Sequence, residues 1–197
     1  GAPRFPMEPQ NPPYYPVLWT SCGFDLVQTY YSTRINDPFP LLKALRPKYH
    51  RCLARGYRLR PVDRDSLEGD LRLVHSVSHC AFADGFLFSP LPFSRFARLY
   101  RQVVGFIDQG LTWIAYAPDG TAVGFVFAFF DPQAPGPAGA VNIKTLAVVP
   151  GHRLEGVGSA LLHQVYRETA RKGFTSVNHC LIRRGNHSGK LDYGTGH

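Results

Sequence analysis

The chain has 197 residues, of which 44% are hydrophobic and 18% are charged, and its formal net charge is +8. This composition is typical of a globular protein and excludes a disordered chain or a coiled coil. No apolar run approaches the ~20 residues that span a bilayer, and residues 1–9 have no apolar signal-peptide core, so we expect a cytoplasmic protein without membrane contact.

The excess of basic residues has two interpretations, a polyanionic partner or a solvated basic surface. The 22 lysines and arginines are dispersed, with no basic tail and no recognition-helix signature, so nucleic acid is a poor candidate partner. The four cysteines (Cys22, Cys52, Cys80 and Cys180) form no C-x-x-C motif. We therefore expect buried free thiols and no metal site.

The first 55 residues predict an extended arm, a helix, a strand and a linker. Residues 1–13 are rich in proline, and residues 14–23 predict a short helix whose last residue, Gly23, supplies the left-handed conformation that closes a helix. Residues 26–35 are rich in Val, Thr, Tyr and Ile and predict a strand. Residues 36–55 contain three prolines and are interpreted as a linker.

Hydrophobic periodicity predicts a domain of mixed strands and helices in residues 56–197. The predicted elements are a strand at 56–62, helices at 63–84 and 93–109, strands at 111–116, 122–130 and 140–149, a helix at 154–172 and a strand at 174–182. A tight turn of sequence Pro-Asp-Gly joins two of these strands into a hairpin. Strands that alternate with helices in this way indicate an α/β (α+β) fold with a mixed sheet.

The strongest motif lies where the strand at 140–149 leads into the helix that follows. Gly156 and Gly158 stand at the start of that helix, where backbone N–H groups are unpaired and the helix dipole is positive. Glycine lacks the Cβ atom that would keep a phosphate from these donors, and Arg153 adds a positive charge. No lysine follows the glycines, as a Walker loop requires, and the two glycines do not complete a Rossmann fingerprint.

This segment resembles the acyl-CoA loop of the GNAT superfamily, whose pattern is Arg/Gln-x-x-Gly-x-Gly/Ala. Arg153, Gly156 and Gly158 match its three fixed positions, and the resemblance extends over about residues 50–190. It implies a mixed, mostly antiparallel sheet flanked by helices. It also implies an N-acetyltransferase that moves an acetyl group from acetyl-CoA to a small-molecule or peptide amine by direct attack. The alternative is a non-catalytic acyl-CoA-binding sensor or interaction module.

The resemblance also implies which residues touch the cofactor. The backbone of one strand would pair with the pantetheine amides, the N–H groups of the helix start would hold the pyrophosphate, and a polar residue after the last strand would complete the site. These residues are Leu146, Ala147, Val148, Arg153, Leu154, Glu155, Gly156, Val157, Gly158, Ser159 and Asn186.

Catalysis by direct attack requires a base for the amine and an acid for the leaving thiolate. Candidate bases are His75, His79 and Asp84, and we single out His79 and Asp84. Candidate acids are Tyr14, Tyr15 and Tyr193, and we single out Tyr193 because family members commonly use a tyrosine near this position. Cys180 is a poorer candidate nucleophile, because its neighbour His179 would point to the opposite face of a strand.

Residues 1–35 resemble the closing helix–strand unit of the same family, whereas the further strand that usually follows Asn186 is missing. One interpretation is that the early strand fills the vacant sheet edge, either in this chain or, by swapping, in a homodimer. The other is that residues 1–35 are the tail of a first lobe in a two-lobed, bacterial-type member. The prolines between residues 38 and 47 favour the second. Both predict that this segment is packed, with the following side chains buried: Tyr14, Leu18, Phe24, Val27 and Tyr30.

Overall fold

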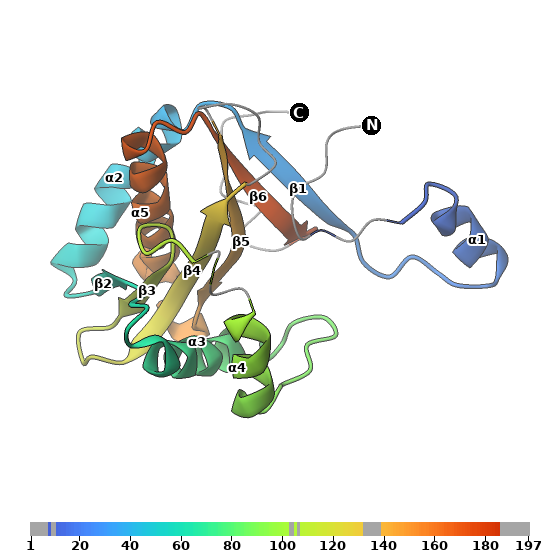
Figure 1. The fold of residues 1–197 in the computed structure, drawn as a ribbon, viewed down its shortest axis with the longest axis horizontal. Coiled ribbons are helices and arrows are strands. Elements are labelled where there is room, and N and C mark those ends of the chain that lie inside the picture. The colour runs from blue at the N-terminus through green and yellow to red at the C-terminus, as the bar shows by residue number, and fades with distance from the viewer. Residues whose placement is uncertain (1–7, 9–10, 103–104, 106, 132–138, 186–197) are drawn as a thin grey trace.

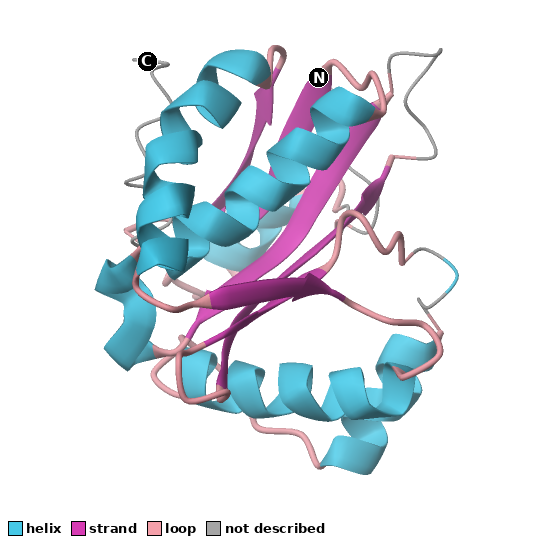
Figure 2. Cartoon of the chain, turned by 90° about the vertical axis from the view of Figure 1, so that its left-hand side faces the viewer, coloured by secondary structure: helices cyan, strands magenta, loops and turns pink. Residues whose placement is uncertain are grey.

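The structure, a computed structural model, describes residues 8, 11–102, 105, 107–131 and 139–185. Its centre is a six-stranded sheet with helices on both faces (Figure 1, Figure 2). In chain order the elements are α1 (Tyr15–Ser21), β1 (Tyr30–Ile35), α2 (Phe39–Ala54), β2 (Arg58–Pro61), α3 (Leu67–Phe82), α4 (Phe93–Arg101), β3 (Trp113–Tyr116), β4 (Ala122–Phe130), β5 (Ala140–Val148), the 3-10 helix η2 (Pro150–Glu155), α5 (Val157–Arg171) and β6 (Ser176–Arg183).

The strand order across the sheet is β1-β6-β5-β4-β3-β2. Every neighbouring pair is antiparallel except β5 and β6, which are parallel. The predicted mixed, mostly antiparallel sheet flanked by helices is therefore confirmed. The strands and helices predicted after residue 56 are also present, although the helix predicted for residues 93–109 ends at Arg101.

Two hydrophobic cores cover the two faces of the sheet. Successive side chains of a strand point to opposite faces. Val126 and Ala128 of β4 accordingly join the core beneath α2 and α5, whereas Phe125 and Phe127 join the core beneath α3 and α4. Both sets are buried, which explains why β4 reads as an almost unbroken apolar run.

The predicted linker at residues 36–55 is wrong, because this segment contains the 16-residue helix α2. Its prolines are compatible with a helix: Pro38 and Pro40 stand at the helix start, where a missing N–H costs nothing, and only Pro47 lies in the interior. Leu45 and Cys52 are buried against the core that α5 also covers, so packing outweighs the unfavourable propensity of one internal proline.

The predicted strand near the N-terminus pairs with β6 and forms an edge of the sheet within this chain. This is the placement that the proline spacing had disfavoured. The assignment of residues 1–35 to a preceding lobe stays a prediction.

The predicted burial within residues 11–35 is wrong: all five side chains expected to be buried are exposed, including that of Tyr30 in the paired strand β1, and the clearest case is α1. This short helix ends before Gly23 as expected, but it projects from the body of the protein (Figure 1) and none of its residues is buried. Leu18 is 50% exposed and Val27 is 72% exposed. A helix of seven residues has little stability of its own, so regular apolar spacing was insufficient evidence of packing.

The cysteines are free, as predicted, but only Cys52 and Cys180 are buried, whereas Cys22 and Cys80 are exposed. Within the described ranges, no three His, Cys, Asp or Glu side chains form a group that could hold a metal ion. Over the same residues, no helix combines the length and the apolar character needed to cross a bilayer.

The contrast between α1 and β1 predicts very different amide exchange. Because α1 buries no side chain, its backbone hydrogen bonds should open at almost no cost, whereas those of β1 are tied to β6. In hydrogen–deuterium exchange of the intact chain, the alternate amides of β1 that bond to β6 should therefore be protected far more strongly than the amides of residues 18–21. Equal protection of both segments would show that α1 packs against something in solution.

Candidate functional site

The site begins where β5 and β6 separate. The two strands pair from Ala140 and Ser176 only as far as Ile143 and His179, but β5 continues beside β4 to Val148. The register of β4 and β5 shifts at this point, so that Lys144 is an extra residue on β5. Such a bulge bends a strand and increases its twist. In the described part of the chain, the end of β5 therefore has no strand along the edge that faces β6.

The hydrogen-bond pattern identifies which backbone groups point into this gap. Val149 donates its N–H to the carbonyl of Val123 at 2.9 Å. Because hydrogen-bonded pairs alternate along an antiparallel ladder, Ala147 also bonds to β4, whereas Leu146 and Val148 direct their N–H and C=O groups towards β6. Of these, the Val148 carbonyl accepts a bond from Arg153 Nε at 3.2 Å.

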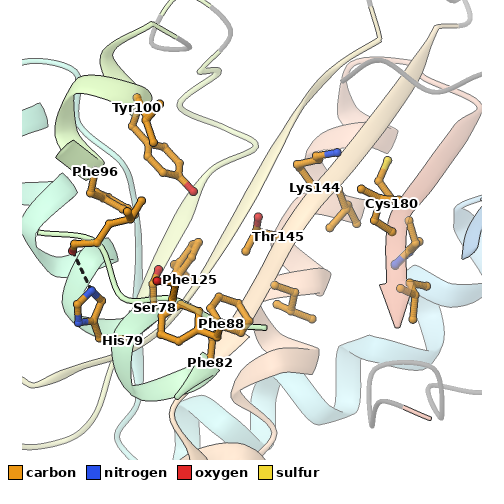
Figure 3. Close-up of a pocket in the computed structure, with 18 residues that line it drawn as sticks. Ser78, His79, Phe82, Phe88, Phe96, Tyr100, Phe125, Lys144, Thr145 and Cys180 are labelled. Atoms are coloured by element: carbon orange, nitrogen blue, oxygen red, sulfur yellow. Dashed lines mark hydrogen bonds between the residues drawn. The ribbon is translucent and has the colours of Figure 1, made fainter. Parts of the chain in front are cut away.

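A cavity of about 510 Å³ occupies the gap between the strands and extends under α3 and α4 (Figure 3). Residues 143–146 of β5 and 179–182 of β6 form one wall. The opposite wall is mainly apolar and comes from α3, α4 and the segment between them. The volume is in the range of small-molecule sites.

The open strand leads directly to the start of a helix. After β5 the chain forms η2, and Gly156 then adopts φ = 84°, a left-handed conformation that favours glycine. Gly156 has no side chain to cap α5, so the first N–H groups of this helix remain available to an anion. A Cβ atom at Gly158 would meet Val148 Cγ2 at 3.7 Å and Leu146 Cδ2 at 3.9 Å, which are ordinary contacts.

The charged side chains of this loop are bonded to the protein. The Arg153 guanidinium donates to the carbonyls of Val148 and Ala81, at 3.2 Å and 2.9 Å, and so connects η2 to β5 and to the last turn of α3. Glu155 forms an ion pair with Arg55 of α2 at 2.6 Å. Leu154 is 95% exposed. The loop therefore offers backbone donors at the start of α5, while its ionic side chains fix its position.

The comparisons with known proteins agree with this geometry. The model of the acetyltransferase (GNAT) family matches residues 76–188, more than half of the chain. The chain belongs to this family.

Solved structures show the same fold at low sequence identity. A GCN5-related N-acetyltransferase from Sphaerobacter thermophilus is similar with a TM-score of 0.58 and 18% identity, over 86% of this chain and 48% of that one. A Trypanosoma brucei acetyltransferase has a TM-score of 0.52 and 20% identity, over 72% of this chain and 92% of that one. An integron cassette protein from Vibrio cholerae has a TM-score of 0.55 and 17% identity, over 72% and 85%.

This GNAT chain thus spans about half the length of the Sphaerobacter protein and most of the length of the other two. At these identities the likeness shows the fold alone. No protein of curated function matches the sequence at a significant level.

Of the predicted bases, which all lie within the described residues, only His79 lines the cavity. His75 and His79 approach the same carbonyl, that of Leu91, with their Nε2 atoms at 2.7 Å and 3.2 Å (Figure 3 shows the His79 bond). A carbonyl accepts only from N–H, so this contact places the proton on Nε2 and leaves Nδ1 as the basic nitrogen. Asp84 is exposed and lies outside the described cavity lining.

Tyr14 and Tyr15 are not brought to the site. Both lie at the start of α1, which projects from the body of the protein (Figure 1), and neither lines the cavity. Tyr193 and Asn186 lie outside the described residues, so their roles stay predictions.

Sequence reasoning missed several polar residues of the cavity, among them Lys144 and Tyr100. The one available signal for Lys144 was that it is the only charged residue of the predicted strand at 140–149. The bulge that places this lysine is a feature of strand pairing.

Burial shifts the pKa values of two titratable residues of β6, Cys180 and His179. It raises the pKa of the Cys180 thiol to about 12, with a further contribution from the charge of Glu8, so the thiol is neutral and does not suit a nucleophile. Burial also lowers the pKa of His179 to about 4. His179 Nε2 lies 2.8 Å from the Tyr166 hydroxyl on α5, on the face away from Cys180 as predicted.

The lowered pKa of His179 predicts a specific acid sensitivity. The unfolded chain binds a proton at His179 near pH 6.5, whereas the folded chain binds it only near pH 4. Protonation of the unfolded chain therefore favours unfolding below pH 6.5. The folded state keeps its full stability above pH 6.5 and loses stability as the pH falls towards 4. Between pH 7 and pH 5 this group should lower the free energy of unfolding by about 2 kcal/mol. Urea unfolding at both pH values should show this decrease in the wild type, with a smaller decrease in His179→Gln. An identical decrease in both proteins would contradict the assignment.

Proposed function

We propose that this protein is an acyl-CoA-dependent N-acetyltransferase that transfers an acetyl group from acetyl-CoA to a small-molecule or peptide amine. One observation carries the proposal: the open edge of β5 leads directly into the uncapped start of α5. The open edge of β5 could pair with the amides of a pantetheine arm, and the free N–H groups at the start of α5 could bind a pyrophosphate. Family membership supports the same type of reaction.

The backbone geometry of β5 indicates which of residues 146–148 would pair with the pantetheine arm. Leu146 and Val148 present groups towards the gap, whereas Ala147 bonds to β4, so the pantetheine should pair with the first two. The N–H groups of residues 157–159 would hold the pyrophosphate. Arg153 acts mainly by holding η2 against β5 and α3, with its positive charge kept beside the helix start.

The chemistry then takes place in the cavity. Acetyl-CoA supplies an activated thioester carbonyl. The amine nitrogen attacks this carbon, the C–S bond breaks, and the sulfur leaves with the bonding electrons and takes up a proton, while the nitrogen loses one. Of the predicted bases, His79 lines the cavity, and its Nδ1, the ring nitrogen that does not contact the Leu91 carbonyl, would accept the proton from the amine.

The pyrophosphate contact can be tested by one charge at the start of α5. There is space for a small side chain at Gly158, and an aspartate there is favourable for the helix itself because it lies at the positive end of the dipole. We expect Gly158→Asp to bind acetyl-CoA at least about tenfold more weakly than Gly158→Asn, a difference of about 1.4 kcal/mol. Isothermal titration calorimetry of the two variants, which have nearly the same side-chain volume, measures this difference. Equal affinities would place the pyrophosphate elsewhere.

The role of His79 can be tested against its neighbour. His79→Gln should slow acetyl transfer by about 10²-fold or more, the usual contribution of a general base. His75→Gln should have a much smaller effect, because His75 contacts the same carbonyl but is absent from the described lining of the cavity. Steady-state rates with an accepted amine decide the question. Equal losses in both variants would indicate a structural role for the histidine pair.

Release of the CoA thiol separates the enzyme from the alternative of a sensor. An enzyme incubated with acetyl-CoA should release thiol when it is offered suitable members of a panel of small amines and peptides. A protein that binds acetyl-CoA but releases no thiol with any of them would be a sensor or interaction module.

A further inference from the structure

Helix α2, which packs against α5 (Figure 1), has a basic outer surface. The helix and the residue that ends it contain no aspartate or glutamate but carry exposed lysines and arginines, namely Lys43, Arg46, Lys48, Arg51 and Arg55. Solvated basic surfaces are common, so the position of these charges relative to the candidate site decides whether they have a role.

The C-terminal half of α2 lies beside the start of α5. The Lys48 carbonyl oxygen is 3.6 Å from the position that a Cβ atom of Gly156 would occupy. Farther along α2, Arg55 Nη1 lies 2.6 Å from Oε2 of Glu155, the residue that precedes this glycine. Both contacts place this part of α2 against the loop whose helix start is proposed to hold the pyrophosphate.

Three basic residues share the flank of α2 that borders this loop. Lys48, Arg51 and Arg55 are spaced i, i+3 and i+7, so they follow one line along the helix. The opposite flank carries Tyr49, which stacks on His163 well inside α5, with 4.4 Å between the ring centroids. The line of basic residues therefore lies towards the N-terminal end of α5 and not along its middle.

We propose that Lys48 and Arg51 bind the phosphate on the ribose 3′ oxygen of acetyl-CoA, and that the enzyme thereby selects CoA thioesters over donors that lack this phosphate. This inference rests on the proposed acetyltransferase function. The 3′ phosphate is a monoester with a charge of about −1.5 to −2 at pH 7. The N–H groups at the start of α5 suit the pyrophosphate, whereas a separate phosphate monoester beside them suits the ammonium of a lysine and the fork of an arginine.

The ion pairs of this region leave these two charges available. The one carboxylate that pairs with this flank in the described residues is that of Glu155, and its partner is Arg55. Lys48 and Arg51 form no ion pair within the same ranges. The pair of Arg55 with Glu155 instead fixes the end of α2 to η2. Helix α2 also lies outside residues 76–188, which match the family model, so the proposed contacts do not belong to the family motif.

CoA and 3′-dephospho-CoA differ only in this phosphate and test the proposal without any catalysis. Isothermal titration calorimetry should show that the wild type binds CoA at least about tenfold more tightly, as expected of charge-assisted contacts. In the double variant Lys48→Gln/Arg51→Gln, the two affinities should agree within about threefold, because the groups that distinguish the ligands are gone.

A matched control removes the same charge from the same helix. Lys43→Gln/Arg46→Gln changes two exposed residues that stand five and two positions before Lys48 and so lie off its flank. This control should keep the wild-type preference for CoA and bind 3′-dephospho-CoA within about twofold of the Lys48→Gln/Arg51→Gln variant. Glutamine is a good helix former, and thermal unfolding of each variant establishes that it is folded.

Equal affinity of the wild type for the two ligands would overturn the proposal and leave the proposed function intact. A preference for CoA that survives in Lys48→Gln/Arg51→Gln, or that is lost equally in the control, would also overturn it. Binding of neither ligand would overturn the proposed function as well. With an active enzyme, the preference in kcat/KM for acetyl-CoA over its 3′-dephospho form should fall in Lys48→Gln/Arg51→Gln through KM alone, because this phosphate is remote from the thioester. A fall in kcat with an unchanged KM would contradict the assignment.

Discussion

The separation of β5 from β6 is the feature on which the rest of this structure depends. Two parallel strands are normally buried and continuously paired. Here the pairing stops after four residue pairs, from Ala140 with Ser176 to Ile143 with His179. The backbone of β5 beyond this point has hydrogen-bonding groups that need partners, because an unpaired buried N–H or C=O is costly. A bound ligand that resembles a strand meets this need, and the cavity provides the space for it.

Structural features before and after the point where β5 and β6 part fix the separation of the two strands. Just before it, Asn142 and Asn178 face each other across the strands with an amide hydrogen bond of 2.7 Å, and Arg34 of β1 donates to Asn178 at 2.8 Å. Beyond it, the register of β1 and β6 also shifts, and Leu181 adopts φ = 51°, which is unusual for a residue other than glycine. Both strands that border the cavity are thus irregular at the same level of the sheet. The paired ends stay fixed while the free ends diverge.

Local patterns predicted most of this fold, and tertiary context explains what they missed. The loop at Arg153, Gly156 and Gly158 was identifiable because a glycine-rich helix start depends only on neighbouring residues. Helix α2 was missed because its prolines outweighed its apolar spacing, although packing against α5 stabilises it. The place of Lys144 in the cavity depends on a bulge in the pairing of β5 with β4, and hydrophobic periodicity along one strand does not reveal a bulge. In the same way, the carbonyl partners of Arg153 come from β5 and α3, so its positioning role was not predictable from the motif.

The central claim is that acetyl-CoA lies along the open edge of β5. Residue-resolved hydrogen exchange with and without acetyl-CoA tests it most directly, because the strand contains its own control. The amides of Leu146 and Val148 should exchange more slowly in the presence of acetyl-CoA, together with those of residues 157–159. The amide of Ala147, already bonded to β4, should change little. Binding of acetyl-CoA without protection of Leu146 and Val148 would contradict the account.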